Sequence, residues 1–120
     1  MEFKVNGNLH TLKFGIGFLF KLDEVYKAEH EGMKLGAGIQ LAYPSLLMMS
    51  VPALARIIHC ALPNGVSLGQ VNEAIEEYAD DHDGLEGLFD AVVEGLAKSN
   101  VIKDTINKLM PTNKEETPEI

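Results

Sequence analysis

Cysteine is almost missing from this sequence, and so are long apolar runs and clusters of basic residues. The single cysteine, Cys60, excludes an intramolecular disulfide and a metal site built from cysteines. The apolar runs are far shorter than the ~20 residues that a membrane-spanning helix needs, so no membrane association is expected. Ten Lys and Arg residues are spread thinly and the isoelectric point is near 4.9. Without a basic patch, the sequence predicts no nucleic-acid partner.

Charge is missing from one long stretch of the chain. From Leu35 to Asn72 the only charged residue is Arg56, whereas Glu73–Glu94 holds nine acidic residues and no Lys or Arg. The net charge of −8 therefore comes from an acidic block that follows an uncharged one. A domain this small has a large surface for its volume, so part of the uncharged stretch is expected to face another protein. This pattern predicts a protein that works by binding.

Length and composition predict one globular domain. The chain has 120 residues, of which 46% are hydrophobic, enough for a single core. We expect the domain to span residues 1–111 and residues 112–120, which are polar and aperiodic, to form a disordered tail. The opening MEFKV lacks the layout of a signal peptide, so the expected location is the cytoplasm.

Periodicity predicts a hairpin and then a helix in the first third of the chain. Apolar and polar residues alternate over residues 1–14 around Asn6-Gly7, a pair suited to a tight hairpin turn. Apolar residues then recur at helical spacing over residues 18–30. A flexible connector is expected at the three glycines that follow, Gly32, Gly36 and Gly38.

The remaining sequence is predicted to be helical. Residues 39–49 form a short helix or two turns interrupted by Pro44. Ser50 and Pro52 are suited to the start of an apolar helix over residues 51–62, and apolar helices are normally buried. Further helices are expected from a Ser67–Gln70 capping box, after an acidic turn at residues 80–84, and up to Pro111. The predicted fold is α+β and mostly helical, with the hairpin packed on about five helices.

Three patterns that suggest chemistry have simpler interpretations. A calcium loop aligned on Gly84 would need Ala79 as its first ligand, which alanine cannot supply. His59 and Cys60 are adjacent in a helix, so their side chains diverge rather than form a nucleophilic pair. Gly15-Ile16-Gly17 lacks a third glycine and a βαβ context for binding phosphate. We therefore expect no catalytic residues, no metal and no cofactor, and a protein that is not an enzyme.

The candidate binding residues lie in the uncharged stretch before the apolar helix. Met48-Met49 is notable because methionine adapts to varied apolar partners, although it also fills gaps in cores. The predicted protein-binding residues are Ile39, Leu41, Tyr43, Leu46, Leu47, Met48 and Met49.

Three segments carry a resemblance to a known family. They are the opening MEFKVNGNLHTLKFGIGFLFKLDEVY, the connector GMKLGAGIQLAYPSLLM and the segment VPALARIIHCAL, which leads into the acidic, helical C-terminal half. Over roughly residues 1–100 the chain resembles the tail assembly chaperones of long-tailed, siphovirus-type phages and of prophages in Gram-positive bacteria. The resemblance lies in pattern rather than in a catalytic signature, and it supplies no catalytic residues.

The resemblance implies a function. Such proteins bind the long, helical tape measure protein, keep it soluble, help to recruit tail tube protein and are absent from the finished virion. Many are also made in a longer, frameshifted form, of which this chain would be the shorter product. An apolar binding surface also predicts self-association into a homo-oligomer. The alternative is a structural virion or connector subunit that stays in the particle.

Overall fold

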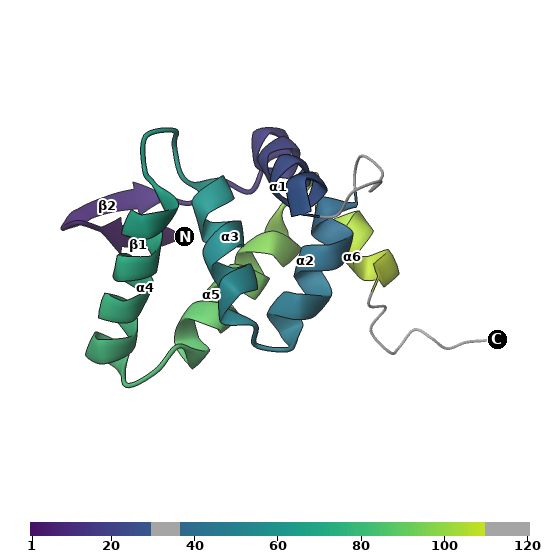
Figure 1. Ribbon diagram of the computed structural model, residues 1–120. Helices are drawn as coiled ribbons and strands as arrows, with labels where there is room; N and C mark the ends of the chain where they lie inside the picture. Colours follow the sequence, from purple (N-terminus) through teal and green to yellow (C-terminus); the bar gives the residue numbers. More distant parts are fainter. Residues whose placement is uncertain (30–36, 110–120) are drawn as a thin grey trace.

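The computed structural model describes residues 1–29 and 37–109 (Figure 1). Two strands and six helices lie in these residues, so the fold is α+β and mostly helical, as predicted, with one helix more than the expected five or so. The helices are α1 (Ile16–Glu29), α2 (Gly38–Leu47), α3 (Val51–Ala61), α4 (Leu68–His82), α5 (Glu86–Lys98) and α6 (Lys103–Leu109). The predicted tail, residues 112–120, lies outside the described residues, as does most of the predicted glycine connector.

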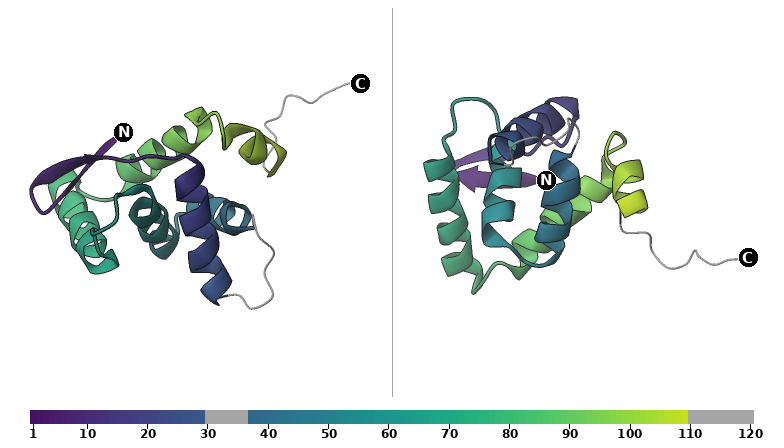
Figure 2. Two further views of the ribbon diagram at one scale, coloured as in Figure 1. Left: turned by 90° about the horizontal axis from the view of Figure 1, so that it is seen from above. Right: turned by 45° about the vertical axis from the view of Figure 1, so that its right-hand side comes forward.

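The N-terminal hairpin forms where the sequence predicts it. Strands β1 (Glu2–Val5) and β2 (Asn8–Thr11) pair antiparallel, with Phe3 opposite His10. Asn6 and Gly7 both have positive φ, 55° and 80°, as the type I′ turn of a two-residue hairpin loop requires. The buried side of β1 packs on α4, so the hairpin and α4 lie at one end of the molecule and α6 at the other (Figures 1 and 2).

Helix α3 is the centre of the core, as its apolar composition predicts. It packs against α1, α2, α4 and α5, and Leu54, Ile57 and Ile58 are fully buried. Its start is fixed locally, because the Ser50 hydroxyl accepts a hydrogen bond from the Ala53 N–H (3.3 Å) and Pro52 occupies the first turn. The capping box also forms at the start of α4, with Ser67 and Gln70 bonded reciprocally.

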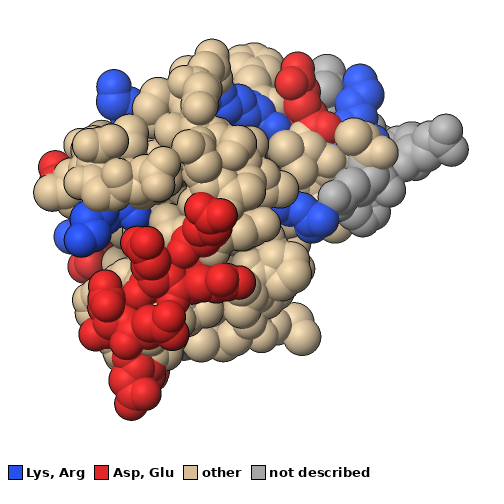
Figure 3. Space-filling model, turned by 60° about the vertical axis from the view of Figure 1, so that its left-hand side comes forward, with Lys and Arg blue, Asp and Glu red and all other residues tan. Residues whose placement is uncertain are grey.

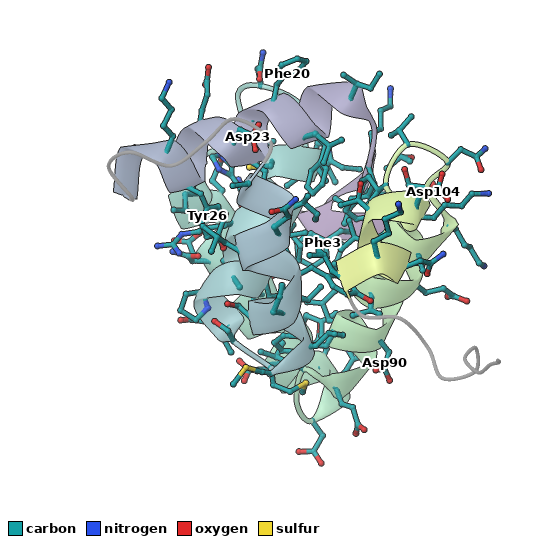
Figure 4. All side chains as sticks on the ribbon, turned by 90° about the vertical axis from the view of Figure 1, so that its right-hand side faces the viewer. Phe3, Phe20, Asp23, Tyr26, Asp90 and Asp104 are labelled. Atoms are coloured by element: carbon teal, nitrogen blue, oxygen red, sulfur yellow. The ribbon has the colours of Figure 1, made fainter. Side chains whose placement is uncertain are left out.

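Two local predictions need correction, and one alternative is decided. Gly38 belongs to α2 rather than to a connector, and its N–H donates to the Asp23 carboxylate of α1 (3.0 Å; Figure 4). Residues 38–47 form one helix that contains Pro44, which settles the choice between a helix and two turns. The acidic segment at residues 80–84 is not all turn, because α4 continues to His82 and only Asp83-Gly84 reverses the chain. The contact with Asp23 in α1 accounts for the helical position of Gly38, whereas the end of α4 is stabilised locally, by the contact of His82 with Tyr78.

Candidate functional site

The turn between α2 and α3 places a methionine where glycine is usual. Helix α2 ends in a Schellman motif, in which the Ser50 N–H donates to the Ser45 carbonyl and the Met49 N–H to the Leu46 carbonyl, both at 3.0 Å. The residue after the C-cap, Met49, accordingly has a left-handed conformation with φ 64°. Glycine normally occupies this position, because a side chain there is strained. Strain of this kind concentrates at functional sites, and here it holds a long apolar side chain at the surface.

Apolar side chains are exposed all around this turn. Met48 is 81% exposed, Met49 51%, Val51 43% and Leu47 39%. We call these four residues the corner surface. Leu41 is 39% exposed, as is Leu47. It lies seven residues before Met48, so the two side chains lie on the same side of α2. Four neighbouring apolar side chains in contact with water form a patch of the kind that protein partners cover.

The seven predicted binding residues divide into two groups. Ile39, Tyr43 and Leu46 are buried in the core, and burial raises the pKa of the Tyr43 hydroxyl. Leu41, Leu47, Met48 and Met49 are exposed. The buried residues recur at i, i+4 and i+7, the spacing of one helix face, so the sequence places them together but does not show that theirs is the covered face. Val51 was missed, because it was assigned to the buried helix that follows. A binding role for any of these residues stays a prediction.

Two grooves flank the corner surface. The first, which we call the α5 groove, has a volume of about 640 Å³ and runs between the end of α2 and α5. The second, the α4 groove, has a volume of about 330 Å³ and runs between the start of α3 and α4. The α5 groove is lined by Leu46, Leu47, Met49, Gly87, Phe89, Asp90, Ala91, Val93 and Glu94. The α4 groove is lined by Val51, Pro52, Ala55, Arg56, Leu68, Asn72, Ile75 and Glu76. Leu47 and Met49 of the corner surface line the α5 groove and Val51 lines the α4 groove, whereas Met48 lines neither.

The acidic block forms an exposed acidic rim, which reaches the α4 groove at Glu76 and the α5 groove at Asp90 and Glu94. All nine acidic side chains of Glu73–Glu94 are exposed, and many of them gather on one face of the molecule (Figure 3). Asp90 projects from α5 at the same end of the molecule as the α2–α3 turn (Figure 4). The Glu94 carboxylate lies 3.3 Å from the Lys98 ammonium, one turn further along α5. The candidate surface therefore combines apolar side chains with an acidic border.

The side chains that could act in catalysis or bind a metal have structural roles outside the corner surface. A ring nitrogen of His59, Nε2, lies 2.9 Å from the Val66 carbonyl oxygen, so it holds the loop that follows α3. Cys60 is buried, and burial raises the pKa of its thiol to about 11, so the thiol stays protonated at neutral pH. His82 stacks on Tyr78 with ring centroids 3.8 Å apart. Within residues 1–29 and 37–109, no three His, Cys, Asp or Glu side chains are grouped to hold a metal ion.

Comparisons with known proteins agree with the resemblance noted in the sequence. A family model described as "phage tail assembly chaperone protein, TAC" matches residues 2–110. Neither the curated proteins nor the solved structures gave a match. The family match covers the hairpin, all six described helices and the corner surface. In the part of the chain that the structure describes, no helix is both long and apolar enough to cross a membrane.

Proposed function

This chain belongs to the phage tail assembly chaperone family, and from that premise we propose that it binds the tape measure protein, keeps it soluble and aids polymerisation of the tail tube. The observation that carries this proposal is the corner surface, where Met48 is 81% exposed beside Met49 and Val51. A chaperone needs an apolar surface that is open before its client arrives. Here a strained backbone turn and not a mobile segment provides that surface.

Methionine suits a client that offers many similar segments. Its unbranched, polarizable side chain repacks against different apolar shapes, and an amphipathic helix binds a groove through residues at i, i+3, i+4 and i+7. The corner surface, with a groove on either side, has the form of such a receptor. The acidic rim keeps the free protein soluble by charge repulsion. These features support helix-in-groove binding of the tape measure protein.

We propose further that the protein acts without catalysis or cofactor in the host cytoplasm, and that it is absent from the mature virion. Tail tube protein is its second proposed partner, recruited once the tape measure protein is bound. In the absence of a client, the corner surface pairs copies of the chain, so that self-association and client binding compete. A protein inventory of finished virions distinguishes this function from that of a structural or connector subunit, which would remain in the particle.

Co-expression with the tape measure protein tests the proposal. We expect the client to become soluble and to co-purify with the wild-type chain. Met48→Lys should abolish co-purification, because a charge would then enter an apolar interface. The matched control is Leu9→Lys, which changes another exposed apolar residue on the hairpin at the other side of the core, and should leave the complex intact.

The outcome can contradict the proposal in two ways. If the client is equally soluble with and without this chain and no complex is recovered, the proposed function is wrong. If Leu9→Lys and Met48→Lys impair binding equally, the corner surface is not the binding site. Circular dichroism of each variant shows whether it is folded.

A further inference from the structure

The lining of the α5 groove is partly apolar and partly acidic. Its apolar lining includes Phe89 and Val93, and its charged lining consists of Asp90 and Glu94, with no Lys or Arg among the lining residues. Glu86 precedes Asp90 by four residues, so these three carboxylates form a row along one face of α5. At a rise of 1.5 Å per residue the row is about 12 Å long.

The α4 groove differs in charge. Its lining holds one cation and one anion, Arg56 and Glu76. The Arg56 guanidinium lies 5.6 Å from the centre of the Tyr26 ring, so it has an intramolecular contact on α1. The α4 groove is therefore balanced, whereas the α5 groove carries only negative charge. Charge complementarity singles out the α5 groove as the place for a cationic partner.

We infer that the α5 groove binds an amphipathic helix whose apolar stripe is bordered by Lys or Arg at intervals of four residues. The inference rests on the proposed function and specifies the chemistry of the client segment. Apolar residues of the client would pack on Leu47, Met49 and Val93, and its cations would face the carboxylate row. Because both helices have the same rise, cations at i, i+4 and i+8 match the spacing of that row.

The carboxylates of the row are available for such a partner. Asp90 is exposed and has no ion-pair partner in the described part of the chain. Glu94 is paired with Lys98, but both side chains are largely in water, 66% and 74% exposed. An exposed pair of this type contributes little free energy, so a client cation can replace Lys98. Ion pairs at the border of a groove mainly select the partner and fix its orientation.

Two synthetic helices test the inference without a natural client. Both have 18 residues and the same leucine stripe; one carries Lys at every flanking position and the other Glu. Fluorescence anisotropy with the full chain measures their dissociation constants. We expect the Lys peptide to bind at least about tenfold more tightly than the Glu peptide, since two or three weak ion pairs become repulsive contacts. The difference should shrink as salt screens the charges. Equal binding of the two peptides would overturn the inference.

A charge reversal locates the interaction. Asp90→Lys combined with Glu94→Lys should weaken binding of the Lys peptide about tenfold and strengthen binding of the Glu peptide. The matched control is Glu73→Lys with Glu77→Lys, which makes the same change in net charge on exposed positions of α4 that do not line the α5 groove. We expect less than a twofold change from the control. If both double variants weaken binding equally, the effect is one of overall charge and the α5 groove is not the site.

The tape measure protein separates this inference from the proposed function. If the client co-purifies with the wild-type chain but the peptides show no preference for Lys, the charge inference is wrong and the chaperone function stands. If the Lys peptide binds in the α5 groove but the tape measure protein is not captured, the groove chemistry is right and the proposed function is wrong. Urea unfolding of every variant confirms that binding is lost from a folded protein.

Discussion

Helix α3 and the corner surface are both apolar and almost without charge, but they lie in opposite environments. Both belong to the stretch between Leu35 and Asn72, where Arg56 is the only charged residue. In α3, Leu54 and Ile57 are fully buried, whereas Met48 in the corner surface is 81% exposed. The difference arises because four helices surround α3, while the α2–α3 turn lies at the end of that packing. A lack of charge therefore marks two things here, a core helix and an exposed apolar surface.

The largest expected effect on the free energy of unfolding comes from replacing a leucine with alanine in helix α3, and the same replacement in the corner surface provides the comparison. Leu54→Ala should reduce the free energy of unfolding by about 3 kcal/mol, because the fully buried side chain leaves a cavity. Leu47→Ala should cost less than about 1 kcal/mol, because that side chain is 39% exposed and buries less apolar area. Urea unfolding measures both values. Similar losses from the two variants would mean that Leu47 is core and that the contrast between the regions is false.

A smaller effect should appear at Gly38, on the buried side of α2. A Cβ at Gly38 would lie 2.7 Å from the Asp23 carboxylate oxygen and 3.0 Å from the backbone nitrogen of Asp23. The carboxylate cannot turn away without losing its hydrogen bond from the Gly38 N–H, and the backbone of α1 cannot yield easily. Gly38→Ala should therefore destabilise the protein by about 1–3 kcal/mol in urea unfolding.

Gly69 provides the control for Gly38, because it also lies in a helix. Its added Cβ would meet nothing closer than the Ser67 hydroxyl at 3.8 Å. Gly69→Ala should stabilise the protein by about 0.5–1 kcal/mol, since alanine favours the helix and restricts the unfolded chain. If Gly38→Ala is as stable as Gly69→Ala, then α1 and α2 do not approach as closely as the structure shows.

Local signals predicted much of the fold. The hairpin turn at Asn6-Gly7, the cap at Ser50 and the capping box at Ser67 and Gln70 all formed, because each depends on residues within three or four positions. The role of Gly38 depends on Asp23, fifteen residues earlier in the sequence. A contact of that kind has no local signature, so the sequence suggested a connector instead.

The candidate site was predicted only in part, for the same reason. The sequence identified the uncharged stretch but not which side of α2 is covered, because α1, α5 and α6 approach it from distant parts of the chain. It also gave no sign of the left-handed turn at Met49, since methionine does not favour positive φ. The carboxylate row became significant only when α5 was placed beside the end of α2.

A small effect on stability, and the sharpest test of the corner surface, concerns Met49 itself. Met49→Ala keeps the left-handed strain and removes the side chain, whereas Met49→Gly removes both. Met49→Gly should therefore be more stable than Met49→Ala by about 1 kcal/mol, because alanine is strained at positive φ and glycine is not. Both variants should bind the tape measure protein equally weakly, since each lacks the apolar side chain. Equal stability would show that residue 49 is not left-handed in solution. Undiminished binding by both variants would show that the Met49 side chain does not contribute to client binding.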